Sequence, residues 1–315
     1  MTSWRDRGAD RRGFTLLELL IALLMGVIVL ASATSVATST FRNQDGMRTR
    51  ENVVRQARFV GMSLDRDLSE AGVELESDIS FGSVAVRNDT LSILSVAYDP
   101  DRAPVYRMVP QDDAGVLLPP GGSCGYYCVN LRGGTTGAEV EIEPGDIALL
   151  NAGGARRLIV ARAVQPIPDS TAVTFFDGDS YLLRPANYAG GLRLPSGGTS
   201  VQKLRAVTYW MERGMLMRAE RFGEDGKLAG VPVAEGVDSF TVSLVFNDGS
   251  EASEANPTDG NSDNDYDDIV SVRLRLRLMP DSSNSGAARG EQPSGRSFDW
   301  RFSPRNLIYE RNRTR

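Results

Sequence analysis

The sequence predicts an α+β fold in which a long N-terminal α-helical spine packs on an antiparallel β-sheet head. An apolar run from Phe14 to Ala33 leads into helical spacing of apolar residues up to residue 71, and the first proline is Pro100. Beyond residue 77, apolar and polar residues alternate as in half-buried strands. We therefore divide the chain into a polar leader (1–13), an apolar helix (14–37), an amphipathic helix (38–72) and a β-rich head (73–315).

The apolar helix is long enough to span a membrane. Its twenty residues from Phe14 to Ala33 rise about 30 Å, which is the thickness of a bilayer core. The leader before it carries four arginines and two aspartates. By the positive-inside rule the leader stays in the cytoplasm, so we expect a single pass through the membrane with the large polar remainder on the other side.

Glu18 is the only ionisable residue between Phe14 and Ala33. A carboxylate inside a membrane span is unfavourable by about 2.5–3.5 kcal/mol on insertion scales, so such a group usually has a function and a partner. Cleavage between Gly13 and Phe14 would create a free α-amine, which would be a natural partner for this carboxylate.

The segment RRGFTLLELLIAL resembles the class III signal of type IV prepilins and type II secretion pseudopilins. In that superfamily a prepilin peptidase cuts after the glycine and methylates the new terminal phenylalanine. The resemblance implies that Gly13 is the cleavage-site residue, that Phe14 is N-methylated, and that Glu18 is the assembly carboxylate. Its implied partners are the prepilin peptidase, other minor and major pilins, the inner-membrane assembly platform and membrane lipid. The implied location is the inner membrane, with a cytoplasmic N-terminus and a periplasmic head, and then a pilus or pseudopilus.

Two other N-terminal signals remain open. Arg11 and Arg12 also resemble a twin-arginine export signal, for which Ala31-Ser32-Ala33 would serve as the cleavage site. A plain signal anchor is the second alternative. Neither alternative explains why the apolar helix contains the acid Glu18. The mature chain would begin at Phe14 for a prepilin, at Thr34 for a twin-arginine signal and at Met1 for a plain signal anchor.

The amphipathic helix is predicted from apolar residues at spacings of three and four: Val54, Ala57, Gly61, Leu64 and Leu68. Gly72 is a plausible C-cap, and Gly26 and Gly46 are the expected points of flexibility.

The head shows its clearest strand at 270–278, where valines and leucines alternate with Ser271, Arg273, Arg275 and Arg277. A second strand is expected at 240–246, and residues 201–211 and 214–221 are expected to form a hairpin. Weaker strands are expected at 83–87, 90–97, 146–150 and 157–164, with loops at 110–137 and 185–200.

Residues 205–310 are similar to the C-terminal half of PilW-type minor pilins and, next, of J-type pseudopilins, and the closing FSPRNL resembles the ending of minor pilins. The resemblance implies a minor type IV pilin that acts in pilus assembly or priming. A J-like type II secretion pseudopilin and a tip adhesin or DNA-uptake subunit are the alternatives. The middle of the chain, 75–200, resembles no family that we can assign.

The composition argues against an enzyme. The chain has no histidine, which removes the commonest general base and transition-metal ligand, and no cofactor is expected. Cys124 and Cys128 are expected to form a small disulfide, because two thiols without histidine make a poor zinc site.

Two charged features of the head allow more than one interpretation. Alternating oxygen donors at Asp259, Asn261, Asp263, Asp265 and Asp267, followed by Asp268, suit Ca²⁺, but the EF-hand glycine and glutamate are missing, and a solvated loop is the alternative. The arginines of the 270–278 strand are expected to line a solvent-exposed strand face opposite neighbouring carboxylates. A formal net charge of −6 makes nucleic acid an improbable partner.

Overall fold

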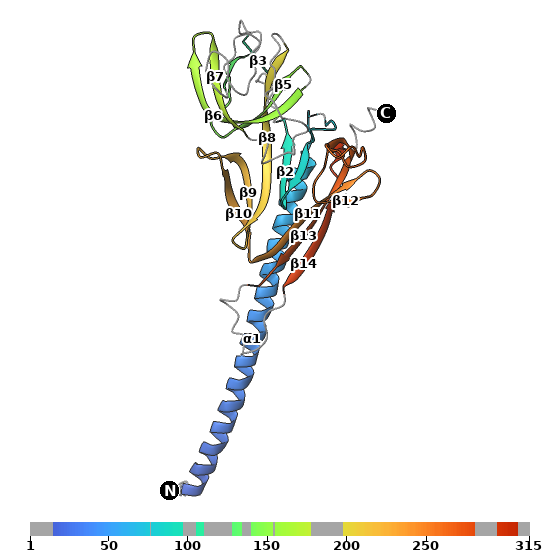
Figure 1. Cartoon of the computed structure of the whole chain (residues 1–315). Helices are drawn as coiled ribbons and strands as arrows, with labels where there is room; N and C mark the ends of the chain where they lie inside the picture. Colours follow the sequence, from blue (N-terminus) through green and yellow to red (C-terminus); the bar gives the residue numbers. More distant parts are fainter. Residues whose placement is uncertain are drawn as a thin grey trace, which may run out of the picture. The chain divides into compact units, whose positions relative to one another are not determined.

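The computed structural model describes residues 15–75, 77–96, 105–109, 128–133, 140–153, 155–177, 198–280 and 295–307. Helix α1 (Leu16–Ser69) contributes its residues up to Asn52 to one compact unit. Its residues from Val53 onward belong to a second unit, together with all the strands (Figure 1). The predicted α+β class is confirmed.

The first half of α1 begins at a capping box. Thr15 precedes the helix, its hydroxyl oxygen accepts the Glu18 N–H at 3.2 Å, and Glu18 Oε2 accepts the Thr15 N–H at 3.1 Å. The helix continues through both Gly26 and Gly46. Beyond Leu30 the hydroxyls of several residues donate to carbonyls three or four residues earlier in the helix, so the polar groups of this segment are satisfied internally. These residues are Ser32, Thr34, Ser39 and Thr40.

The second half of α1 buries one stripe in the head, formed by Val53, Ala57, Val60, Leu64 and Leu68. The stripe is rotated slightly from the predicted one, since Val53 and Val60 are buried whereas Val54 and Gly61 are only partly so. The missing side chain of Gly61 leaves room for the Trp300 indole, which a Cβ at this position would meet at 3.4 Å.

The turn after the C-terminal end of α1 is held by backbone and side-chain hydrogen bonds. Gly72 adopts a φ of +74°, as predicted for a C-cap glycine, and its N–H donates to the Leu94 carbonyl at 3.0 Å. Asn306 Nδ2 donates to the Ala71 carbonyl at 3.0 Å. The ending FSPRNL therefore supplies a hydrogen-bond donor to a carbonyl of the turn that follows the helix.

Within the described residues, ten strands form the larger sheet, and each of their pairings is antiparallel. They are β1 (Val84–Arg87), β2 (Thr90–Ser95), β3 (Tyr106–Met108), β4 (Cys128–Arg132), β5 (Ile147–Ala152), β6 (Ala155–Ile167), β7 (Ser170–Asp177), β8 (Thr199–Glu212), β9 (Met215–Phe222) and β10 (Leu228–Glu235).

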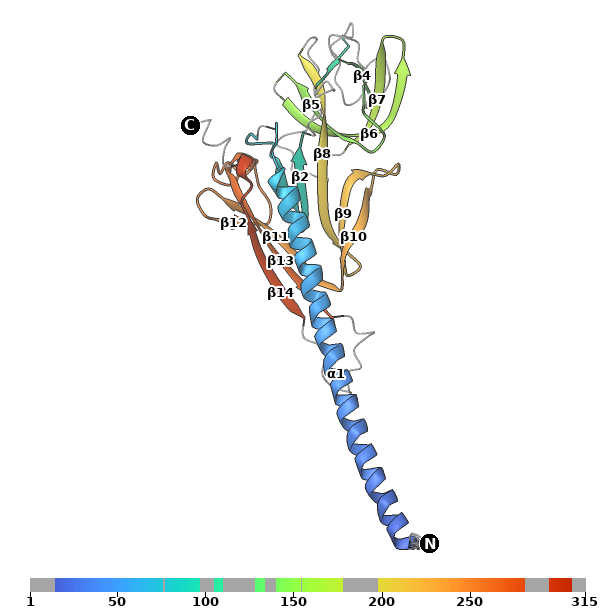
Figure 2. The ribbon, with the colours of Figure 1, turned by 180° about the vertical axis from the view of Figure 1, so that it is seen from behind.

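The pairings of this sheet close a ring. The order β8-β3-β4-β7-β6-β5 returns to β8, because β5 also pairs with β8 along residues 147–152. The ring encloses a core of its own, which includes Tyr106, Val129, Leu150 and Val173. The far half of β8 leaves the ring and pairs with β2 and β9, so β8 is shared between the ring and an open sheet (Figures 1 and 2).

The predicted hairpin is confirmed as β8–β9. Its turn residues Arg213 and Gly214 both have positive φ values, 50° and 74°, as a two-residue type I′ turn requires.

In the part of the chain that the structure describes, four strands form the smaller sheet, in the order β12-β11-β13-β14. They are β11 (Val237–Phe246), β12 (Glu251–Ala252), β13 (Ile269–Leu278) and β14 (Arg296–Phe302), and a 3-10 turn at Tyr266–Asp268 precedes β13. The second half of α1 lies between this sheet and β2 and β8, and all of them contribute to one apolar core (Figure 2).

The alternation predicted for 270–278 holds only from Val272 onward. The register shifts between Val245 and Phe246, which pair with Ser271 and Ile269, so Val270 is the extra residue of a bulge in β13. Ile269 and Ser271 are buried, and Val270 is half-buried.

The division of the described strands into two sheets goes beyond the predicted antiparallel β-sheet head. One fold prediction was wrong, because residues 128–132 form β4 although they fall inside the predicted loop 110–137. Both faces of β4 are buried, so it lacks the polar–apolar alternation that identifies a half-buried strand. The rest of that loop up to residue 127, and residues 185–197, lie outside the described residues.

Candidate functional site

The N-terminal segment divides into residues that the structure describes and residues that it does not. Gly13 and Phe14 lie outside the described residues, and Glu18 is at the third position of α1, where its carboxylate accepts hydrogen bonds from the Thr15 N–H and hydroxyl, both at 3.1 Å. The capping box therefore gives Glu18 a local role that the sequence analysis missed, although the pattern Thr-x-x-Glu is visible in the sequence.

The side chains around Glu18 form an apolar surface. Leu16–Phe41 is long and apolar enough to cross a membrane, and none of it is buried within the protein. Among the described residues it is the single segment with these properties. A helix that is apolar on every side needs lipid or neighbouring helices around it.

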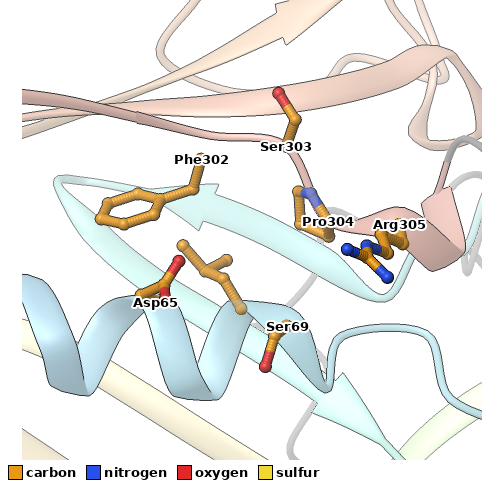
Figure 3. A pocket seen from close by; sticks show the side chains of 7 residues that line it. Asp65, Ser69, Phe302, Ser303, Pro304 and Arg305 are labelled. Atoms are coloured by element: carbon orange, nitrogen blue, oxygen red, sulfur yellow. The ribbon is translucent and has the colours of Figure 1, made fainter.

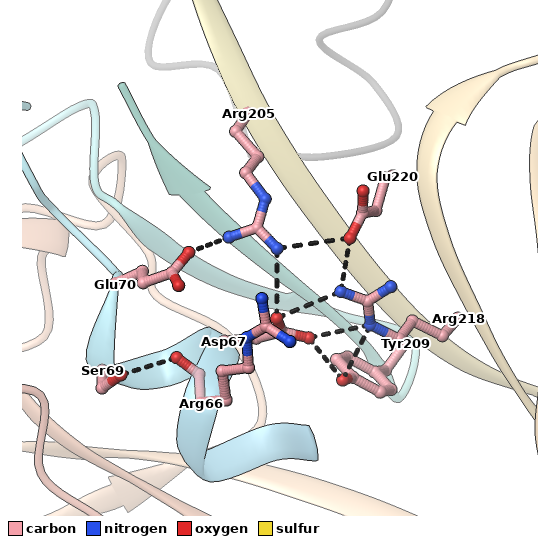
Figure 4. A network of polar contacts seen from close by, with 8 residues as sticks. All are labelled: Arg66, Asp67, Ser69, Glu70, Arg205, Tyr209, Arg218 and Glu220. Atoms are coloured by element: carbon pink, nitrogen blue, oxygen red, sulfur yellow. Dashed lines mark hydrogen bonds and ion pairs between the residues drawn. The ribbon is translucent and has the colours of Figure 1, made fainter. Parts of the chain in front are cut away.

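An ionic network centred on the buried Asp67 connects the end of α1 to the larger sheet (Figure 4). Asp67 is 2% exposed and lies one residue before Leu68 of the buried stripe. Its carboxylate accepts hydrogen bonds from Tyr209 Oη at 2.6 Å and from Arg218 Nε and Nη2 at 2.8 and 3.1 Å. Arg205 of β8 approaches the same carboxylate at 3.3 Å and also pairs with Glu70.

Glu220 completes the network by accepting hydrogen bonds from Arg205 at 3.2 Å and Arg218 at 2.6 Å. Two arginines thus lie among three carboxylates, and every charge has an opposite partner. Additional hydrogen bonds of this kind offset the free-energy cost of removing the charges of an ion pair from water.

The electrostatics of the network follow from this geometry. Burial raises the pKa of the Asp67 carboxyl, but the hydrogen bonds from Arg218 and Tyr209 and the charges of both arginines outweigh it, so its pKa lies below the ordinary value. Burial and the adjacent Asp67 carboxylate raise the pKa of Tyr209. Asp67 is therefore a charged carboxylate at neutral pH, and the network fixes the last turn of α1 to β8 and β9.

The acidic loop does not bring the predicted oxygen donors together as one set. Asp259 accepts hydrogen bonds from the Asn261 N–H and from the Asn256 and Asn264 side chains, and Asn261 accepts the N–H of Asp263. A second group, formed by Asp265, Asp267 and Asp268, has one carboxylate oxygen from each residue within 4.8 Å of the others.

The arginines of β13 are paired with carboxylates, as expected for a solvent-exposed strand face. Arg273 lies between Asp299, at 2.8 Å, and Glu251, at 3.2 Å. Arg275 and Arg277 approach Asp299 and Asp238 at 3.5 and 3.4 Å. Cross-strand pairing neutralises this row, so it offers little net charge to a polyanion.

Cys128 begins β4, is buried and is disulfide-bonded. Cys124 lies outside the described residues, so the pairing of the two cysteines stays a prediction.

A groove of about 450 Å³ lies between the end of α1 and the segment after β14 (Figure 3). Its charged lining residues are Asp65 and Arg305.

Comparison with known proteins identifies the N-terminal segment alone. No curated protein matches the chain. Residues 8–34 match the family model described as the prokaryotic N-terminal methylation motif. This match indicates a protein of the type IV pilin-like prepilin superfamily.

Proposed function

We propose that this chain is a minor type IV pilin that is cleaved after Gly13, N-methylated at Phe14 and incorporated into a filament through α1, where it acts in pilus assembly or priming. The observation that carries the proposal is the N-terminal methylation motif over residues 8–34, which overlaps the exposed apolar segment Leu16–Phe41 of α1.

Assembly follows from the properties of that helix. The leucines and valines of Leu16–Phe41 can exchange lipid for neighbouring helices with little change in burial. The Glu18 carboxylate of one subunit would then pair with the Phe14 amine of another, which offsets the burial of both charges and sets the register between subunits.

The head supports a minor rather than a major subunit. Residues 73–315 include two sheets and a closed ring with its own core, and so large a head is awkward to repeat along a fibre. The arginines of the leader support a cytoplasmic N-terminus and a periplasmic head before assembly.

The mature N-terminus tests the processing step. Mass analysis of the protein purified from membranes is expected to find a chain that begins at N-methyl-Phe14. Replacing Gly13 by leucine should leave the precursor uncut, because the new side chain adjoins the cleaved bond, whereas Gly8→Leu changes the same leader and should be cleaved normally. A mature chain that begins at Thr34 or at Met1 would reject the proposal in favour of export or of a plain anchor.

Deletion of the gene separates a pilin from a secretion pseudopilin. We expect the deletion to remove or strongly reduce surface filaments while type II secretion of a reporter enzyme continues. Complementation with the intact gene is the control. Lost secretion with normal filaments would identify a J-like pseudopilin instead.

A further inference from the structure

The strand β14 forms a free edge of the smaller sheet (Figure 1). It pairs with β13 along all 7 of its residues without a shift in register, and none of the described strands pairs with its other side. A regular edge strand presents a row of unpaired N–H and C=O groups, which is a template for the addition of another strand.

The other free edges among the described strands carry features that hinder strand addition. β10 contains Pro232 and two shifts in register, and the second half of β6 contains Pro166 and a shift at Arg162. The first half of β11 has a shift at Asp238, β1 has 4 residues and β12 has 2. Proline, bulges and short length are common protections of edge strands, and β14 has none of them.

The side chains of β14 alternate between two faces of the sheet. Phe298, Trp300 and Phe302 are half-buried and pack against the apolar core, with Trp300 next to Gly61 of α1. The rings of Phe298 and Trp300 are stacked, with their centroids 5.7 Å apart. Asp299 and Arg301 lie between these residues in the strand and therefore face the other way. A strand added at this edge would meet aromatic rings on one face and charges on the other.

Arg301 has no carboxylate partner among the described residues. Asp299 pairs with Arg273 and Arg275 of β13. Arg301, in contrast, lies directly opposite Arg273 and donates to the Ser271 hydroxyl at 2.9 Å. Like charges directly opposite each other are unfavourable, so an acid on the free side of β14 would stabilise Arg301.

The sequence of β14 is complementary to itself in an antiparallel pair. Residues 298–302 read Phe-Asp-Trp-Arg-Phe. When two copies pair with Trp300 on the two-fold axis, Asp299 of each copy lies opposite Arg301 of the other, and Phe298 lies opposite Phe302. Side chains that lie opposite each other share a face, so each arginine meets an acid and each ring meets a ring.

We propose that β14 pairs with β14 of a second copy of this chain in this register, so that the two smaller sheets form one continuous sheet. The partner is a second copy because the acid that Arg301 lacks and the rings that would cover Phe298 and Phe302 are all supplied by β14 itself. This contact goes beyond the proposed incorporation through α1.

The pairing orients the two spines in opposite directions. Trp300 lies next to Gly61 and Asn306 donates to the Ala71 carbonyl, so β14 runs in the same direction as the second half of α1. Two antiparallel copies of β14 therefore hold these halves of α1 antiparallel. Subunits of one filament insert their spines in one direction, a step that rests on the proposed pilin function. The two copies thus belong to two filaments, and the contact links one filament to another.

Self-association is tested on the full-length protein in detergent micelles by analytical ultracentrifugation. A contact through one strand is small, so the wild type should form dimers with a Kd of about 100 μM or tighter. A protein that stays monomeric up to about 300 μM would overturn the proposal.

Charge reversals test the register of the pair. Arg301→Asp and Asp299→Arg each place like charges opposite each other when identical chains pair, so each should weaken self-association at least about tenfold. An equimolar mixture of the two variants restores opposite charges at both positions and should form dimers again, which misfolding of either variant could not produce.

Arg296→Asp is the matched control, because it makes the same charge change on the same strand outside residues 298–302. It should alter the Kd by less than about threefold, as expected for an exposed charge. Single variants of Asp299 and Arg301 that associate like the wild type, or a mixture of them that stays monomeric, would contradict the proposed register.

Sheared filaments test where the contact occurs. Filaments from a strain with tagged Arg301→Asp should co-purify with filaments from a second strain with differently tagged Asp299→Arg, whereas filaments that carry the same variant should not. Dimers in micelles without such co-purification would reject the link between filaments. A chain that is not cleaved after Gly13 would reject the pilin function instead, and the dimer in micelles depends on neither cleavage nor incorporation.

Discussion

Asp67→Asn is expected to lower the free energy of unfolding of the head by about 3–5 kcal/mol, the usual loss when one member of a buried ion pair is removed. The substitution keeps the size of the side chain but leaves Arg218 and Tyr209 beside a neutral amide. Glu220 can compensate only in part, because its own side chain is 49% exposed. The substitution therefore weakens the contact that holds the end of α1 against β8 and β9.

Denaturant unfolding of the processed chain in detergent measures this effect by tryptophan fluorescence. Trp210 and Trp300 both lie in the head, and Trp4 belongs to the leader. Asp65→Asn is the matched control, because it makes the same change two residues earlier at an exposed position and should alter the stability by less than about 0.5 kcal/mol. If the two substitutions changed the free energy of unfolding equally, the ionic network of Asp67 would contribute no more stability than an exposed carboxylate does.

The same carboxylate should make the stability of the head depend on pH. A group whose pKa is lowered by folding contributes stability above its ordinary pKa, and loses that contribution as the pH falls through and below it. For Asp67 the ordinary pKa is 3.8, so the wild type should lose stability as the pH falls below about 4. Asp67→Asn should have a flatter profile in this range, and parallel profiles would argue against a charged Asp67 in the folded state.

The sequence predicted the parts of the fold that depend on local patterns. Both halves of α1, the β8–β9 hairpin, β11 and most of β13 show clear periodicity, and the structure has all of them. The closed ring was not predictable in this way. Although β5–β6 and β6–β7 are hairpins, the ring closes through pairs of strands that are distant in sequence, such as β3–β8 and β5–β8. In addition, β3 has only three residues, and β8 belongs both to the ring and to the open part of the same sheet, so no single stretch of sequence carries a pattern that predicts closure.

The same distinction between local patterns and long-range contacts applies to the residues of the candidate functional site. Glu18 was identified because an acid is conspicuous in an apolar helix. Asp67 was missed because other charged residues, such as Asp65 and Arg66, also lie beside the apolar stripe, and its partners Tyr209 and Arg218 are 142 and 151 residues away. Sequence spacing cannot separate one buried carboxylate from its exposed neighbours when the partners belong to distant strands.

Glu18→Gln is expected to abolish incorporation of the chain into filaments. Glutamine keeps the acceptor oxygen that a capping box uses at the third helical position, so the local hydrogen bonds with Thr15 survive. It removes the negative charge, however, and with it the proposed pairing with the Phe14 amine of a neighbouring subunit. An uncompensated amine inside a filament of apolar helices would be strongly unfavourable.

Thr15→Ala provides the reciprocal change, because it removes the capping hydroxyl and keeps the Glu18 charge. Loss of a cap destabilises a helix by about 0.5–2 kcal/mol, which a long α1 should tolerate, so most incorporation should remain. The ratio of the chain in sheared filaments to that in membranes measures the outcome. If Glu18→Gln assembled normally and Thr15→Ala did not, Glu18 would act as a helix cap and the amine pairing would be wrong. Opposite results for these neighbouring substitutions thus separate a local role in α1 from a contact between subunits.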